Sequence, residues 1–228
     1  MREFHREAPL FFVMYINDLH TVISGGHTHL INYADDTSLL IREKCLYDLI
    51  EKCDTEVQHL RLWFNKNKII VNKEKTNCVI FKTKQSNLIL PNTVCINDWN
   101  LPLVTNVKFL GINIDANLSW SVHIEGLCRR LSSVCYCMRI LSSYVDFRTL
   151  KIVYHANFMS LLRYGIIFFG SSVDFQKVFI VQKKIIRIMC KMKYRASCRG
   201  TFRREGLLTA AAVCIYMKRL FSYTSTGK

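Results

Sequence analysis

Hydrophobic and polar residues in the first third of the chain follow two different periods. Residues 29–33 (HLINY) and 37–41 (TSLLI) are short apolar runs separated by Ala-Asp-Asp, which predicts two strands with a tight connection. Residues 45–64 carry apolar side chains at helical spacing, with Glu, Lys and Arg on the other face, which predicts an amphipathic helix. We therefore expect residues 27–42 to form a hairpin that packs against this helix.

The remainder of the chain predicts strands first and helices afterwards. Further strands are predicted at KIIVN (68–72), NCVIFK (77–82), LIL (88–90), VCIN (94–97) and VKFLGINID (107–115). Long helical patterns follow, at 121–142, 146–169, 174–192 and 207–222. No proline follows Pro102 and glycine is sparse in this part, as helices require. The predicted fold class is α+β, with a mixed part followed by a helical part.

The net charge of the chain indicates the kind of partner that it binds. The 228 residues include 32 Lys and Arg against 17 Asp and Glu, a formal net charge of +15. This excess favours a polyanion, either nucleic acid or an anionic membrane surface. A membrane helix is disfavoured because Arg163 splits the longest apolar run, NFMSLLRYGIIFF. The basic runs also lack the wide apolar face that a membrane-surface helix needs.

The spacing of the cysteines and the N-terminal residues indicate whether the protein is secreted. The ten cysteines include no C-x-x-C pair, so we expect reduced, buried small hydrophobes and no zinc site. The opening MREFHREAPLFFVMYINDL mimics a signal peptide but lacks a small-residue cleavage site, so we expect a protein that is not secreted.

Asp35 and Asp36 interrupt an otherwise apolar run. Adjacent carboxylates in an apolar setting repel each other and need protonation, a basic partner or a metal ion. Successive strand side chains point to opposite faces, so one aspartate should face a site and the other should support it. Hard oxygen ligands in small number suit Mg²⁺. Taken alone, the pair favours the alternative of two solvated turn aspartates, because Asp-Asp pairs are common.

A series of motifs surrounds this pair. In chain order it comprises YINDL (15–19), YADD (33–36), WFNKNKIIVNKEKTNCVIF (63–81), KFLGINIDANLSWSVHI (108–124), YGIIFFG (164–170), VQKKIIRIM (181–189) and SCRGTFRREGLLT (197–209). In this order and spacing the chain resembles the reverse transcriptases of non-LTR retrotransposons of the jockey type, which are LINE-like. The resemblance covers nearly the whole chain.

The resemblance implies an RNA-directed DNA polymerase that performs two-metal nucleotidyl transfer with Mg²⁺, with Mn²⁺ as the alternative ion. Its partners would be an RNA template, a DNA primer and deoxynucleoside triphosphates, without a membrane, in the cytoplasm and nucleus. It implies a partial palm with the YADD hairpin at 1–82 and palm-to-thumb strands with a primer-grip-like hairpin at 83–116. A helical thumb and basic C-terminal region would follow at 117–228.

The resemblance also assigns residues to the polymerase site. Asp35 and Asp36 would be the catalytic metal ligands, with Asp35 contacting metal more directly. The other assigned residues are Tyr33 and Ala34 against the primer end and incoming nucleotide, Lys75 near the triphosphate, and Phe109, Leu110 and Gly111 in the primer grip. Lys75 is equally compatible with an ordinary turn lysine.

Other matched positions receive structural or electrostatic roles. Trp120 and His123 match a W-x-x-H motif, for which packing is favoured over catalysis, and Asp18 is interpreted as a helix terminus outside the site. The basic residues expected to contact nucleic acid are Arg187, Lys191, Lys193, Arg195, Arg199, Arg203 and Arg204. A solvated charged face is the alternative for this run.

Two features of the family have no counterpart in the sequence. The family needs a further aspartate on a strand upstream of the YADD hairpin, and a Gly- and Gln-containing segment where this chain has MREFHREAP. The resemblance therefore implies the C-terminal half of a palm plus the thumb, lacking the N-terminal half of the polymerase. We expect the chain alone to be inactive, and the alternative is a non-catalytic nucleic-acid-binding remnant of a decayed element.

Overall fold

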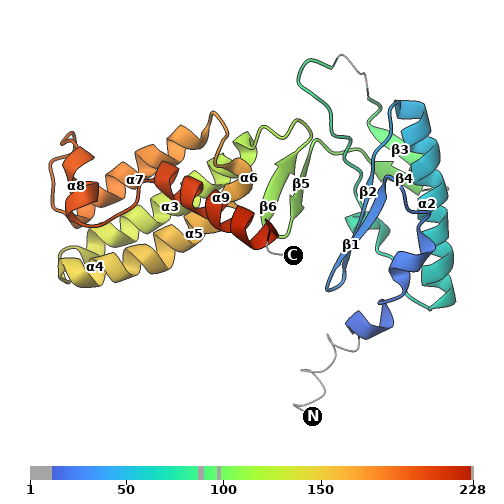
Figure 1. Ribbon diagram of the computed structural model, residues 1–228, viewed down its shortest axis with the longest axis horizontal. Coiled ribbons are helices and arrows are strands. Elements are labelled where there is room, and N and C mark those ends of the chain that lie inside the picture. Colours follow the sequence, from blue (N-terminus) through green and yellow to red (C-terminus); the bar gives the residue numbers. More distant parts are fainter. Residues whose placement is uncertain (1–11, 87–89, 97–98, 227–228) are drawn as a thin grey trace, which may run out of the picture. The chain divides into compact units, whose positions relative to one another are not determined.

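The computed structural model describes residues 12–86, 90–96 and 99–226. The chain forms two compact units: the first comprises residues 1–79 and 87–104, and the second comprises 80–86 and 105–228. The described residues form helices and three two-stranded antiparallel sheets, each a hairpin (Figure 1). The predicted α+β class is confirmed.

The first unit begins with the hairpin that the sequence predicts. Residues 12–15 are helical and are followed by a short 3-10 helix, η1 (Leu19–Val22). Strands β1 (Thr28–Tyr33) and β2 (Asp36–Ile41) then pair antiparallel, with Leu30 opposite Leu39. These two leucines pack on one side of the hairpin against a buried cluster formed by Ile16, Leu19, Leu60 and Trp63.

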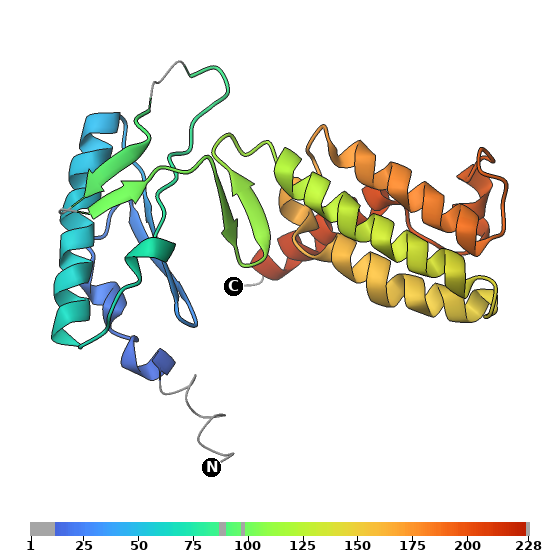
Figure 2. The same cartoon turned by 180° about the vertical axis from the view of Figure 1, so that it is seen from behind.

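Helix α2 (Leu46–Lys66) holds both hairpins of the first unit. Leu60 and Trp63 on α2 contact the β1–β2 hairpin through that cluster, which confirms the predicted packing. Strands β3 (Thr93–Ile96) and β4 (Trp99–Pro102) form the second hairpin, whose buried residues pack near Ile50 and Val57 of α2. Both hairpins lie along the same side of α2 (Figures 1 and 2).

Several predicted strands of the first unit are wrong or lie partly outside the described residues. Residues 69–72 form no strand, and within 77–82 only Cys78 makes a bridge, parallel to Leu103. The cause is the end of α2. Lys68 takes a left-handed φ of 55°, and the Ile69 N–H donates to the Phe64 carbonyl oxygen at 2.9 Å, so these residues cap the helix. Most of LIL, and Asn97 of VCIN, lie outside the described residues, whereas the rest of VCIN lies in β3.

The second unit joins one hairpin to a group of helices. Strands β5 (Asn106–Phe109) and β6 (Ile112–Asp115) pair antiparallel, so the predicted single strand at 107–115 is a hairpin instead. The helical elements are α3 (Ser121–Leu141), α4 (Phe147–Val153), the π-helical turn η3 (Tyr154–Met159), α5 (Ser160–Arg163), α6 (Ile166–Phe169), α7 (Phe175–Met189), α8 (Arg199–Arg204) and α9 (Ala210–Thr226).

The predicted helices agree with these elements to different degrees. The helices expected at 121–142 and 174–192 are confirmed as α3 and α7. The helix expected at 146–169 is not continuous, because the chain turns at Tyr164 and Gly165, where glycine has a φ of 70°. Helix α8 was not predicted, and α9 begins three residues later than predicted and extends further.

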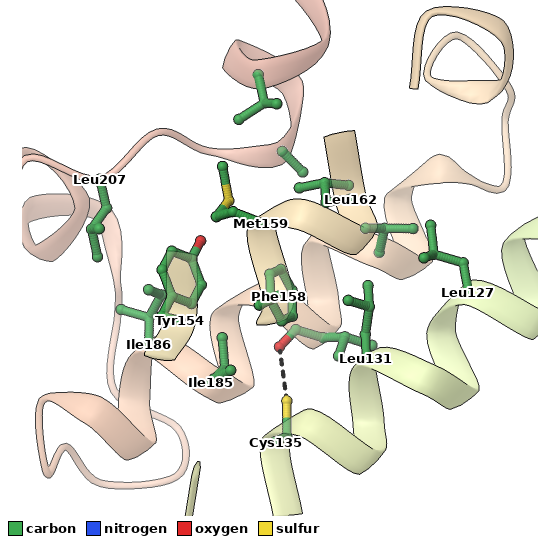
Figure 3. Close-up of a cluster of buried hydrophobic side chains, with 14 of the residues drawn as sticks. Leu127, Leu131, Cys135, Tyr154, Phe158, Met159, Leu162, Ile185, Ile186 and Leu207 are labelled. Carbon is green, nitrogen blue, oxygen red and sulfur yellow. Dashed lines mark hydrogen bonds between the residues drawn. The ribbon is translucent and has the colours of Figure 1, made fainter. Parts of the chain in front are cut away.

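The core of the second unit lies between α3, α7 and the η3–α5 segment. Leu131, Cys135, Phe158 and Ile185 converge in this cluster (Figure 3). Gln182 of α7 is fully buried within it, yet all its side-chain groups are bonded. Its amide nitrogen donates to the Tyr154 hydroxyl and the Leu208 carbonyl oxygen, both at 2.9 Å, and its oxygen accepts the Ala210 N–H at 2.7 Å.

The structure also tests what the sequence predicted for the cysteines and for membrane-spanning helices. All ten cysteines are free thiols, and Cys135, Cys198 and Cys214 are buried. The expectation of burial is wrong for Cys45, Cys95 and Cys137, which are exposed. Every helix in the described ranges is too short or too polar to cross a bilayer.

Candidate functional site

The YADD residues occupy the connection between β1 and β2. Tyr33 pairs with Asp36, so Ala34 and Asp35 form a two-residue turn. Ala34 has a φ of 51°, a left-handed conformation that costs a non-glycine residue roughly 1 kcal/mol. Tyr33 is 62% exposed, and both aspartates are exposed. The turn therefore presents its aromatic ring and two carboxylates to solvent.

The carboxylates of Asp35 and Asp36 offer an incomplete metal site. Within the described residues neither carboxylate makes a hydrogen bond or an ion pair, and no group of three or more His, Cys, Asp or Glu could hold a metal ion. Two carboxylate ligands nevertheless fit Mg²⁺, which is commonly bound by one or two carboxylates together with substrate phosphates. The residues present therefore fit the ion as part of a larger ligand set.

Lys75 lies on a separate short element of the same unit. It ends the 3-10 helix η2 (Lys73–Lys75), and the Asn72 side-chain oxygen accepts the backbone N–H of Lys75 at 3.3 Å. No hydrogen bond or ion pair in the described part of the chain joins Lys75 to Asp35 or Asp36. Lys73, two residues before Lys75, lies over the Trp99 ring, with its Nζ 5.1 Å from the ring centroid. This cation–π contact joins the element that carries Lys75 to strand β4.

In the second unit, the residues matched to the primer grip form the tip of the β5–β6 hairpin. Phe109 pairs with Ile112, and Leu110 and Gly111 form the turn with φ values of 45° and 81°. Positive φ at both turn positions matches the twist of the flanking strands. Tyr164, which follows α5, supports this tip: its hydroxyl donates to the Leu110 carbonyl oxygen.

Trp120 and His123 have the packing role that was favoured for them. The Trp120 ring stacks on Phe168 with centroids 6.3 Å apart, and the His123 ring lies 4.7 Å from that of Phe169. The Nδ1 atom of His123 accepts the Asn113 N–H at 3.4 Å. Burial, and secondarily the charge of Arg130, lower the pKa of His123, which keeps the ring neutral.

The predicted basic residues are spread over the end of α7, the following loop and α8. Arg187 is half-buried and its Nε donates to the Ala196 carbonyl oxygen at 2.9 Å, so it helps to fix the loop. Arg204 pairs with Glu205 at 2.7 Å. The remaining five are exposed and form no ion pair with a described residue; they are Lys191, Lys193, Arg195, Arg199 and Arg203.

Four further polar residues have structural roles; the sequence analysis interpreted Asp18 and did not identify Glu56, Gln182 or Asp115. Asp18 was interpreted correctly as a helix terminus, and its carboxylate accepts the Trp63 indole N–H at 3.4 Å. Glu56 is fully buried on α2 and pairs with Lys52 at 3.0 Å. The sequence did contain a sign of this burial: Glu56 lies three residues after Cys53 and four before Leu60, which places it on the apolar face of the helix. Neither Gln182 nor Asp115 gave such a signal.

Comparisons with known proteins agree with the family that the motifs indicate. Residues 6–114 match the family model described as reverse transcriptase (RNA-dependent DNA polymerase). Over 189 residues the chain is 23% identical to the "Probable RNA-directed DNA polymerase from transposon X-element" of Drosophila melanogaster. That match covers 80% of this chain and 20% of the relative, so the chain spans about a fifth of that protein.

Two further relatives are also proteins of retrotransposable elements. It is 21% identical over 123 residues to the "Retrovirus-related Pol polyprotein from type-1 retrotransposable element R1 2" of Nasonia vitripennis, covering 53% of this chain and 30% of the relative. It is 26% identical over 110 residues to the corresponding R1 3 polyprotein, covering 47% and 29%. No solved structure matches the chain. These matches support a reverse transcriptase fragment of a non-LTR retrotransposon.

Proposed function

We propose that the chain is the part of a retrotransposon's RNA-directed DNA polymerase that carries the catalytic hairpin and a nucleic-acid grip. The main support for this proposal is the exposed turn at Ala34 and Asp35, which lies within the segment that matches the reverse transcriptase family model. In this proposal the first unit is palm and the second is thumb. The protein would act inside the cell, in the cytoplasm and nucleus, on an RNA template primed by DNA.

The proposed chemistry divides among the exposed groups of the hairpin. Asp35 and Asp36 would hold Mg²⁺, with Asp35 closer to the reacting atoms. When bound, such ions stabilise charge on the attacking and leaving oxygens of phosphoryl transfer. The Tyr33 ring and the small Ala34 side chain would lie against the primer end and the incoming nucleotide. The Lys75 ammonium would stabilise the negative charge of the departing pyrophosphate.

The second unit would hold the duplex rather than perform chemistry. The Leu110–Gly111 turn brings backbone close to solvent without a bulky side chain at Gly111, which allows close approach to a nucleic-acid strand. The exposed cations of the loop after α7 and of α8 would contact phosphates. Such contacts are largely independent of base sequence.

The non-catalytic alternative is a remnant that still binds duplex. It shares the thumb with the enzyme proposal but gives no role to Asp35 and Asp36. No feature of the structure or the relatives supports it better than the enzyme fragment. Metal binding at the hairpin therefore separates the two, because a remnant is under no requirement to retain it.

A paramagnetic titration tests the hairpin directly. Mn²⁺ added to the labelled chain, in the presence of primer–template duplex and nucleotide, should broaden the backbone NMR signals of Ala34 and Thr37 before others. Changing both Asp35 and Asp36 to Asn should abolish this selectivity, whereas Asp48→Asn on α2 should leave it intact. Equal broadening in the double variant would reject the hairpin as a metal site.

A salt titration tests the proposed grip. Duplex affinity should fall linearly with salt on logarithmic axes, because each neutralised phosphate contributes roughly 0.9 to the slope. Lys193→Ala and Arg195→Ala should each flatten the slope by about that amount. Arg204→Ala should have less effect, since Arg204 already pairs with Glu205. If all three variants overlay the parent, the basic run is only a solvated face.

A further inference from the structure

The buried carboxylate of Glu56 on α2 bonds the chain just before the β1–β2 hairpin. Its Oε2 atom accepts the backbone N–H of Ser24 at 3.2 Å, and its Oε1 atom accepts the Ser24 hydroxyl. We call these two bonds the tether. The Lys52 ammonium lies 3.0 Å from Oε1 and also donates to the Ser24 hydroxyl, so the three residues close a ring of polar contacts. The ring joins α2 to a residue 32 positions earlier in the chain.

Two glycines separate the tether from the hairpin. Gly25 and Gly26 have left-handed φ values of 71° and 70°, and a Cβ added to either would meet no other atom within 4 Å. Strand β1 begins two residues later, at Thr28. Glycine has the greatest backbone freedom of any residue, so this connection would act as a hinge if the residue before it were not held. Ser24 is that residue, and the tether holds both its N–H and its hydroxyl.

Apolar contacts also join the hairpin to α2. Leu30 and Leu39 pack against the cluster that contains Leu60 and Trp63 of α2. Such burial is non-directional, and a two-stranded hairpin is at best marginally stable on its own. The direction of the hairpin therefore depends on what else holds it. The tether supplies a directional contact at the end of the hairpin opposite its turn.

Stability alone does not account for a carboxylate at this fully buried position. Removing a charge from water is costly, and replacing a buried ion pair by apolar side chains of similar size is often neutral or stabilising. The partners of Glu56 would not be left without water, because Ser24 is exposed and the Lys52 side chain is 31% exposed. An apolar side chain could therefore fill the space, but it could not form the two bonds that fix Ser24.

We propose that Glu56 is a positioning residue for the YADD turn. By holding Ser24 against α2, it prevents rotation at the two glycines and fixes the direction of the hairpin. The carboxylates of Asp35 and Asp36, at the other end of the hairpin, then face a metal ion in one orientation. This last step rests on the proposed function, whereas the tether itself does not depend on a metal ion.

Residual dipolar couplings of the backbone amides test the direction of the hairpin in the full chain. Glu56→Met keeps a similar side-chain volume and removes the carboxylate, so it should unfold at about the same urea concentration as the parent. Its β1 and β2 couplings should no longer fit the orientation relative to α2 that the parent shows. Glu51→Met removes an exposed carboxylate from the same helix and should keep that orientation. Couplings in Glu56→Met that match those of the parent would overturn the inference.

Two further variants separate positioning from packing. Glu56→Gln keeps an acceptor oxygen for Ser24, so its couplings should lie closer to those of the parent than the couplings of Glu56→Met do. Ser24→Ala removes one bond of the tether at an exposed residue and should shift the couplings in the same sense, by a smaller amount. If Glu56→Met does not fold, Ser24→Ala decides: shifted couplings support the tether, and couplings identical to those of the parent reject it.

Mn²⁺ broadening of the Ala34 and Thr37 signals measures the consequence at the turn. With duplex and nucleotide present, the Mn²⁺ concentration at half-broadening should rise about tenfold in Glu56→Met, the lower end of the loss when an outer-shell partner of a metal ligand is removed. It should not change in Glu51→Met. Equal midpoints in the parent and in Glu56→Met would overturn the positioning role.

These outcomes are distinct from failure of the proposed function. A parent chain without selective broadening at the turn would contradict the proposed metal site, and the dipolar couplings would still decide whether Glu56 fixes the hairpin. A parent that binds Mn²⁺ at the turn with the same midpoint as Glu56→Met would contradict the positioning role alone.

Discussion

The hydroxyl of Tyr164 donates a hydrogen bond to the carbonyl oxygen of Leu110, across 54 residues of sequence. The same ring lies against Gly111, where an added Cβ would come 3.6 Å from the Tyr164 ring. Leu110 has a left-handed φ of 45°, a conformation that leucine rarely adopts. Tyr164 therefore holds the hairpin tip in a conformation that its own sequence does not favour.

Tyr164→Phe tests this relationship. The ring and its packing remain, but the bond to the Leu110 carbonyl oxygen is lost, so the free energy of unfolding should fall by about 1 kcal/mol. Amide hydrogen exchange at Gly111 and Ile112 should quicken more than exchange within α3. Tyr144→Phe is the control, because Tyr144 is 81% exposed, and it should change stability by less than about 0.5 kcal/mol. Unchanged exchange at the tip would show that the bond is dispensable.

Gln182→Leu should be the more damaging substitution in the second unit. It removes three hydrogen bonds from a fully buried side chain and leaves the Ala210 N–H without an acceptor. We expect a loss of about 3 kcal/mol in urea unfolding, since each unsatisfied buried group costs about 1–3 kcal/mol. Gln176→Leu, on the exposed face of the same helix, should stay within about 0.5 kcal/mol of the parent. Similar losses in both would contradict the network.

The loop between β6 and α3 should confer acid sensitivity through Asp115. Partial burial would raise the pKa of this carboxyl, but backbone N–H bonds from Ser119 and Trp120 outweigh it and lower the pKa below the usual 3.8. Because the pKa is lower in the folded state than in the unfolded state, the carboxylate stabilises the fold when the pH is above the unfolded-state pKa. This stabilisation is lost as the pH falls through the folded-state pKa.

Asp115→Asn measures that contribution. The variant should be about 1 kcal/mol less stable than the parent at pH 7, because one oxygen cannot accept all three N–H groups. The gap should close as pH falls below 3.8, where Asp115 becomes protonated in the parent. Glu125→Gln, on an exposed position of α3, is the control and should show no such convergence. A gap that is constant with pH would contradict the role of the carboxylate charge.

Primer extension by the purified chain should remain near background. The described residues bring two carboxylates to the β1–β2 turn and no third potential metal ligand to them. With primed RNA template, nucleotides and Mg²⁺, the parent and Asp35→Ala should therefore give equally low incorporation. Robust extension that disappears in Asp35→Ala would show that two carboxylates suffice.

The elements predicted best are those with a long or repeated pattern. The hairpin at 28–41 and the helix at 46–66 followed directly from apolar spacing, as did α3 and α7. The strand predicted at 68–72 failed because its apolar residues follow a helix cap: Ile70 is 95% exposed and meets no partner strand. Periodicity alone could not distinguish these two outcomes. The break at Gly165 did carry a signal, since glycine interrupts the predicted helix there.

The candidate sites were predictable as residues but not as arrangements. YADD identified the turn residues, yet the left-handed Ala34 depends on register, which only the paired strands establish. The contact of Tyr164 with the hairpin tip joins distant segments, and no local pattern reveals such a contact. Arg187 and Arg204 illustrate the same limit, because the sequence does not show that Arg187 donates to the Ala196 carbonyl oxygen or that Arg204 forms an ion pair with Glu205.

Neither unit is one continuous stretch of chain, and this affects how the protein is made and cut. Residues 80–86 belong to the second unit, where the Lys82 N–H donates to the Ala116 carbonyl oxygen at 3.0 Å. The chain then returns to the first unit, where the Val104 N–H donates to the Cys78 carbonyl oxygen at 2.9 Å. During synthesis the first unit therefore stays incomplete until residue 104 has left the ribosome. A single protease cut between residues 80 and 104 would weaken both units instead of releasing one intact.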